Sequence, residues 1–156
     1  MFRVLILCTG NTARSQMAEA LLRQRGGDRI DAASAGSNPG RRVNPLAVEV
    51  LEEIGIAWGG RAPREIGGLG QERWDLVITV CDNAREACPV MPGARVMAHW
   101  GMGDPAAAGG TEGQRREAFR RARDLLADRI AELLALPLET MEAPDLARAA
   151  GRIGSA

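Results

Sequence analysis

The chain has 156 residues, of which 46% are apolar and 26% charged, a mixture that indicates one globular domain and excludes collagen-like and disordered proteins. Twenty basic residues balance twenty acidic ones, so general nucleic-acid binding is not expected. The longest apolar run near the start, residues 4–7, is far too short to span a membrane. We therefore expect a soluble, cytoplasmic protein with neither a membrane nor a nucleic-acid partner. In that reducing compartment, three cysteines favour catalysis or metal binding over structural disulfides.

The first half of the chain alternates expected strands with expected helices. Short apolar runs predict strands over residues 2–7 and 30–34. Between them a helical pattern begins at Ser15 and ends at Gly26 and Gly27. A second helix is expected to start at Pro45, because Asn44 is a preferred N-cap residue and proline suits the first helical position.

Two more strands and two more helices are expected in the second half. The β-branched run 76–80 predicts a buried strand, and residues 94–99 predict a shorter one. A long helix should begin near Thr111, which can form a capping box with Gln114. A weaker helical pattern covers about residues 144–150.

This alternation predicts an α/β fold: a single domain with a four-stranded parallel sheet flanked by helices, doubly wound. We expect the domain to cover residues 1–134, with a tail at 135–156 that is a surface helix or flexible. In such sheets, ligands bind beyond the carboxyl ends of the strands. Cys8, Cys81 and Asp104 each follow a different expected strand, so all three are predicted at one edge of the sheet.

The loop between the first strand and the first helix has the pattern of an oxyanion site. Its backbone N–H groups and the positive helix end can surround an anion, and Arg14 adds a planar fork of donors. The same field favours the thiolate of Cys8, which is the candidate nucleophile, with Ser15 as a hydrogen-bond donor. The expected oxyanion-binding residues are Thr9, Gly10, Asn11, Thr12, Ala13, Arg14 and Ser15.

Cys81 and Cys88 permit three interpretations from the residues alone. They can be two buried cysteines without a reactive role, or ligands of a zinc site with His99, although their spacing is unusual for zinc. They can also be a redox pair. Seven residues of regular helix would separate them by roughly 10.5 Å, beyond the disulfide limit, so the segment between them would have to bend or unwind.

Asp104 and His99 also carry alternatives. Asp104 precedes a proline, a common turn pattern, but its carboxyl group can also protonate a departing oxygen. His99 is the only histidine, and a satisfied core residue is the simpler interpretation for it.

Together these motifs resemble the low-molecular-weight protein tyrosine phosphatase fold family, and more closely its thioredoxin-coupled arsenate reductase branch. The resemblance covers about residues 2–134. It is carried by the run C-T-G-N-T-A-R-S-Q-M-A-E that starts at Cys8, by Cys88-Pro89, by His99-Trp100-Gly101 and by Asp104-Pro105.

The resemblance implies a reaction and a role for each residue. Cys8 would attack arsenate, Arg14 would stabilise the charge, and Asp104 would be the general acid. Cys81 and Cys88 would form the redox relay that ends in their disulfide, which thioredoxin resets. It implies no resident cofactor, only an external thiol reductant.

Two other functional classes remain open. A tyrosine phosphatase would need only Cys8, Arg14 and Asp104, but the chain has no tyrosine and places Ala106 after the Asp-Pro pair. A non-catalytic oxyanion sensor or zinc-held module is the third class. Some relatives bind potassium near Asn11, but Ala57 and Gly59 lack the polar side chains required, so we expect no metal site.

Overall fold

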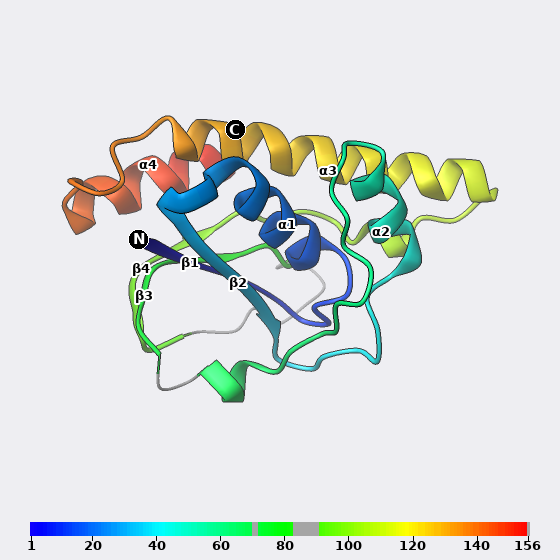
Figure 1. Ribbon diagram of the computed structural model, residues 1–156, viewed down its shortest axis with the longest axis horizontal. Coiled ribbons are helices and arrows are strands. Elements are labelled where there is room, and N and C mark those ends of the chain that lie inside the picture. Colours follow the sequence, from blue (N-terminus) through cyan, green and yellow to red (C-terminus); the bar gives the residue numbers. More distant parts are fainter. Residues whose placement is uncertain (70–71, 83–90, 156) are drawn as a thin grey trace.

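The computed structural model describes residues 1–69, 72–82 and 91–155. Four parallel strands form one sheet in the order β2-β1-β3-β4: β1 Phe2–Cys8, β2 Ile30–Gly36, β3 Trp74–Thr79 and β4 Ala94–His99 (Figure 1). The predicted single-domain α/β class, with a four-stranded parallel sheet flanked by helices, is confirmed. The third strand begins at Trp74, two residues before its expected start, because Trp74 pairs with Ala94 at the start of β4.

β1 is a central strand because its apolar run can be buried on both faces. Val4 pairs with Ala32 of β2 and with Leu76 of β3, and all three are buried. Continuous apolar strands are typical of parallel sheets with both faces covered.

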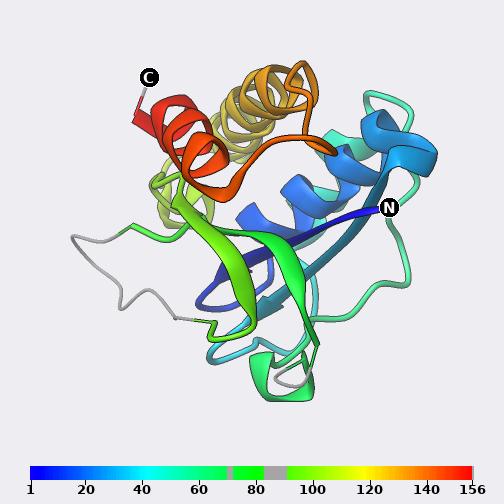
Figure 2. The same cartoon turned by 90° about the vertical axis from the view of Figure 1, so that its left-hand side faces the viewer.

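The α-helices of the described residues share one large core with one face of the sheet (Figure 2): α1 Arg14–Gly26, α2 Pro45–Glu52, α3 Glu112–Leu134 and α4 Ala143–Ser155. The opposite face has a smaller apolar cluster that includes Leu5, Val77 and Leu69. Leu69 comes from a 3₁₀ turn, η2, Ile66–Leu69.

The helix starts follow the expected capping chemistry, with one exception. The Asn44 side chain accepts a hydrogen bond from Leu46 N at 2.9 Å, and Thr111 and Gln114 form a complete capping box. α1 begins after Ala13, whose side chain cannot cap it. The first N–H groups of α1 therefore have no side-chain cap of their own, the condition under which a helix start can bind an anion.

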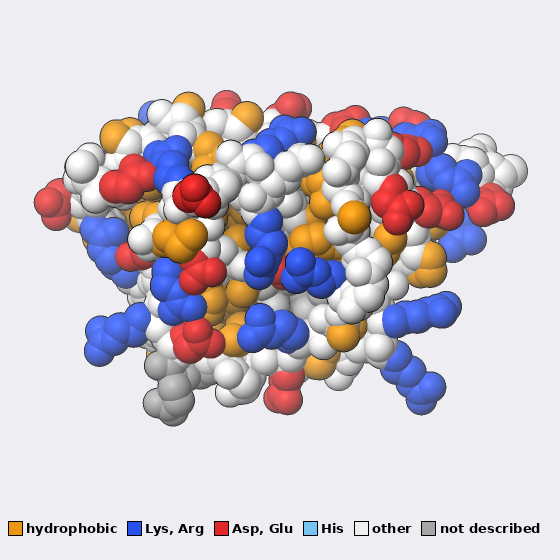
Figure 3. Space-filling view, in the orientation of Figure 1, with side chains coloured by type: hydrophobic (Ala, Val, Ile, Leu, Met, Phe, Trp, Pro, Cys, Tyr) orange, Lys and Arg blue, Asp and Glu red, His pale blue; other side chains and the backbone are white. Residues whose placement is uncertain are grey.

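The segment 135–156 contains α4, which is longer than the expected pattern. It packs against β4 and α3 and buries Leu146, Ala150 and Ile153 in the main core. No helix among the described residues is long and apolar enough to cross a membrane. On the face shown in Figure 3, basic and acidic side chains are intermixed.

Candidate active site

The candidate site lies where β1 ends and α1 begins. Cys8 is the last residue of β1 and Arg14 is the first of α1, so five loop residues turn the chain at the carboxyl edge of the sheet. Asn11 has a φ of 52° and is the one non-glycine residue with a positive φ in the described part of the chain. This conformation folds the loop back toward the end of the strand that it leaves.

Cys8 is a free thiol within this loop and is only 2% exposed. The backbone N–H of Asn11 donates to Cys8 Sγ at 3.1 Å, and the Ser15 hydroxyl lies 2.8 Å from the same sulfur. Donors at these positions stabilise a negatively charged sulfur more than a neutral one. The geometry therefore favours Cys8 as a nucleophile.

The guanidinium of Arg14 faces the loop that follows β4. Its Nη1 donates to the Met102 carbonyl at 3.1 Å, and its Nη2 lies 3.9 Å from Asp104 Oδ2. Arg14 is buried, whereas the side chain of Asp104 is 43% exposed. Asp104 Oδ1 also accepts from Ala106 N and so caps a short 3₁₀ turn, η3, Pro105–Ala107. Asp104 can therefore cap the turn with one carboxylate oxygen while the other faces Arg14, so its two predicted roles are compatible.

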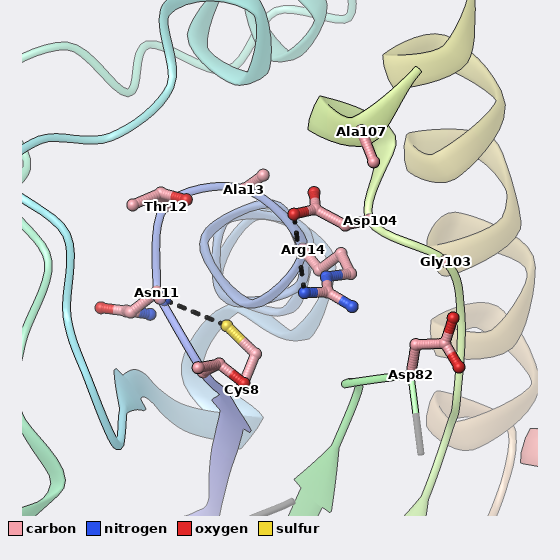
Figure 4. A pocket seen from close by; sticks show the side chains of 11 residues that line it. Cys8, Asn11, Thr12, Ala13, Arg14, Asp82, Gly103, Asp104 and Ala107 are labelled. Atoms are coloured by element: carbon pink, nitrogen blue, oxygen red, sulfur yellow. Dashed lines mark hydrogen bonds and ion pairs between the residues drawn. The ribbon is translucent and has the colours of Figure 1, made fainter. Parts of the chain in front are cut away.

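These groups surround a cavity of about 560 Å³ (Figure 4). Among the described residues, loop residues 8–14 line one side of it, and Asp82, Gly103, Asp104 and Ala107 line another. Figure 4 shows Arg14 and Asp104 side by side, with Asp82 approaching from the end of β3. None of these described lining residues is aromatic.

A buried polar network holds the loop from behind. The Asn11 amide donates to Ser15 Oγ at 2.7 Å and to Ser34 Oγ at 2.9 Å, while its oxygen accepts from Gln16 and from the backbone of Arg64. Ser34 donates in turn to Glu19 at 2.7 Å. Asn11 therefore has four side-chain hydrogen bonds that offset the cost of its positive φ.

The network continues to the surface through an aromatic residue. Trp58 donates from its indole nitrogen to Gln16 at 2.8 Å, and the Arg61 guanidinium stacks 4.1 Å from the Trp58 ring. Arg61 also lies 3.9 Å from Glu19. Sequence reasoning missed this network. Its one visible signal was the pair of polar residues, Gln16 and Glu19, interleaved with the apolar residues Met17, Ala18 and Ala20 near the start of the helix.

The family model described as low molecular weight phosphotyrosine protein phosphatase matches residues 3–143. The chain belongs to this family. It is 41% identical over 127 residues to an arsenate reductase of Halalkalibacterium halodurans, covering 81% of this chain and 91% of that protein. It is 39% identical over 129 residues to an arsenate reductase of Bacillus subtilis, covering 83% and 92%.

Solved structures in the family agree with this assignment. One is described as an arsenate reductase in the phosphate binding state, with a TM-score of 0.70 and 29% identity over 86% of this chain and 98% of that one. Another is a thioredoxin-dependent arsenate reductase of Corynebacterium glutamicum, with a TM-score of 0.60 and 27% identity, covering 86% of this chain and 61% of that one.

The structure brings the predicted phosphatase-like residues Cys8, Arg14 and Asp104 to one cavity. Cys81 is disulfide-bonded and buried directly after β3, and its neighbour Asp82 lines the same cavity. Cys88 lies outside the described residues. His99 is half-buried, and its Nδ1 lies 2.7 Å from Thr79 Oγ1.

Proposed function

We propose that this chain reduces arsenate to arsenite and that Cys8 is the nucleophile. One observation carries the proposal: a free, hydrogen-bonded thiol shares a cavity with the Arg14–Asp104 pair in a chain 41% identical to an arsenate reductase. Arsenate is a tetrahedral oxyanion. Helix N–H groups and a guanidinium fork bind such anions through charge-assisted hydrogen bonds.

The first step is attack of the Cys8 thiolate on arsenic. Arg14 and the loop N–H groups stabilise the oxyanion, and Asp104 protonates the oxygen that leaves as water. Asp104 is suited to this role because its carboxyl group lines the same cavity as Cys8 and remains accessible to solvent. The product is a covalent adduct in which Cys8 Sγ is bonded to arsenic(V).

The second step supplies two electrons. The Cys81 thiolate attacks Cys8 Sγ, arsenic leaves as arsenite, and a Cys8–Cys81 disulfide forms. Cys88 then attacks Cys81, which restores the Cys8 thiol and leaves a Cys81–Cys88 disulfide. The disulfide-bonded state of Cys81 and the place of Asp82 in the cavity wall support this order.

The external reductant in this proposal is a dithiol protein of the thioredoxin class. It would reduce the Cys81–Cys88 disulfide by thiol exchange, so the chain needs no resident cofactor. The named dependence of the Corynebacterium relative on thioredoxin supports the choice. Such a cycle needs a reducing compartment, which makes the cytoplasm the proposed location.

Phosphomonoester hydrolysis through a phosphocysteine is the second candidate. The family description and the trio of Cys8, Arg14 and Asp104 favour it. The cavity wall contributes Ala107 and no aromatic ring among the described residues, which favours a small inorganic anion. We propose hydrolysis as a weak side activity.

The test is a coupled assay with arsenate, thioredoxin, thioredoxin reductase and NADPH. The proposal predicts NADPH oxidation that depends on arsenate and disappears in Cys8→Ser. Rapid aryl-phosphate hydrolysis without arsenate-dependent oxidation would instead favour the phosphatase.

A further inference from the structure

The last helix, α4, starts at residue 143, where the match to the family model ends. It is nevertheless docked onto the strand that leads to the active site. α4 packs against β4 and α3, and Figure 1 shows it beside both (red, behind the orange end of α3). Its apolar residues Leu146, Ala150 and Ile153 are buried in the main core.

The last turns of α4 contact the end of β4 at two points. Trp100 Nε1 donates to the Ala150 carbonyl at 2.9 Å, and both residues are fully buried. At Gly154 the helix backbone is so close that a Cβ would overlap the carbonyl oxygen of His99 and lie 2.5 Å from Trp100 Cδ1. A glycine is therefore required for this close approach.

Arg129 of α3 joins the same two segments. It is 7% exposed, and its guanidinium donates to the Gly154 carbonyl at 3.3 Å and to the Gly101 carbonyl at 3.5 Å. Its Nε is buried without a hydrogen-bond partner. A buried guanidinium that binds two carbonyls fixes the distance between the end of α4 and the loop after β4.

That loop holds two groups that face Arg14. Gly101 is followed by Met102, whose carbonyl accepts from Arg14 at 3.1 Å, and Asp104 comes two residues later. We propose that the end of α4, through Gly154, Trp100 and Arg129, is a positioning element that holds this loop, and thereby Arg14, in the orientation that binds the oxyanion.

The test compares two identical substitutions in α4. Gly154→Ala adds a methyl group against His99, whereas Gly151→Ala, one turn earlier, adds it where nothing lies within 4 Å. The probe is inorganic phosphate. Its protection of Cys8 from iodoacetamide, followed by mass spectrometry of the Cys8 peptide, reports oxyanion binding without any turnover.

In Gly154→Ala we expect protection by phosphate to weaken about fivefold or more, because a displaced donor loses most of its effect. The rate of Cys8 alkylation without phosphate should stay within about twofold of the parent rate, because Asn11 and Ser15 stay in place. A purely structural defect would change the alkylation rate both with and without phosphate. Gly151→Ala should match the parent in both. Trp100→Phe, which removes the hydrogen bond to Ala150 together with part of the buried ring, should weaken protection in the same direction and serves if Gly154→Ala does not fold.

The proposal is overturned if phosphate protects Cys8 equally well in Gly154→Ala, Trp100→Phe and the parent. It is also overturned if Gly151→Ala weakens protection as much as Gly154→Ala. The loss in arsenate turnover that should accompany weaker protection rests on the proposed function. If the parent protein binds phosphate but reduces no arsenate, the proposed function is refuted. The positioning role of α4 is then still decided by the protection assay.

Discussion

Arg14 and Asp104 are 90 positions apart in sequence, yet their charged groups lie 3.9 Å from each other in the wall of one cavity. Arg14 comes from the first turn of α1, and Asp104 from the loop after β4. The pair brings a permanent cation and a titratable acid to the same small space. This arrangement suits a reaction in which an oxyanion is bound and one of its oxygens is protonated.

The first prediction concerns Asp104 as the acid. Asp104→Asn retains an oxygen that can cap η3 but removes the transferable proton, so we expect turnover to fall about 10²–10⁴-fold without loss of folding. Steady-state arsenate reduction and far-ultraviolet circular dichroism measure the two effects. Asp82→Asn is the matched control, because Asp82 lines the same cavity. An equal loss in Asp82→Asn would contradict the assignment of the acid to Asp104.

The second prediction separates the relay from the nucleophile. Cys81→Ser and Cys88→Ser should abolish multiple turnovers of arsenate, because serine cannot complete the two-electron transfer. Both variants should keep hydrolysis of p-nitrophenyl phosphate, which needs only the groups around Cys8. Cys8→Ser should lose both activities. Sustained arsenate reduction by Cys81→Ser with thioredoxin would refute the relay.

Local chemistry explains why much of the fold was predictable. The strand–loop–helix order around Cys8, the Asn44 cap and the Thr111–Gln114 box each depend on residues within a few positions of one another. The prediction that Cys8, Cys81 and Asp104 lie at one edge of the sheet used one further rule, that the carboxyl ends of parallel strands lie at the same edge.

The parts that sequence reasoning missed depend on distant pairs. Ser34 joins Asn11 from 23 positions away, and the Met102 carbonyl binds Arg14 from 88 positions away. Neither contact has a local pattern, because a serine hydroxyl and a backbone carbonyl are common acceptors everywhere. The docking of α4 was also hidden, since a short amphipathic pattern does not identify the surface that it covers.

The third prediction divides the role of Asn11 into backbone and side-chain parts. Asn11→Gly and Asn11→Ala both lose the four amide hydrogen bonds. Only the alanine variant must also hold a residue with a Cβ at a φ of 52°. Its free energy of unfolding should therefore be about 1 kcal/mol lower than that of the glycine variant. Urea unfolding of the two variants gives this difference directly. Equal stabilities would show that the positive φ carries no strain of its own.

The fourth prediction concerns Glu53, which follows α2 and pairs with α3. Hydrogen bonds from Arg120, and to a smaller extent from Arg123, lower the pKa of Glu53 to about 2. Burial alone would raise this pKa, but its effect is smaller. The unfolded chain therefore binds its proton at higher pH than the folded protein. The pairing stabilises the fold above the unfolded pKa, near 4.5, and this contribution is lost as the pH falls toward 2.

Glu53→Gln should accordingly lower the melting temperature at pH 7 by about 2 °C, the scale of a partly exposed ion pair in a domain of this size. The deficit should shrink steadily as the pH falls from 4.5 toward 2, because the unfolded parent chain then binds the proton that folded Glu53 does not accept until about pH 2. Glu52→Gln is the control: this neighbouring exposed carboxylate lies at the C-terminal end of α2, where removing a negative charge is neutral or slightly stabilising. A deficit for Glu53→Gln that is the same at pH 3 and pH 7 would show that lost packing, not charge pairing, accounts for it.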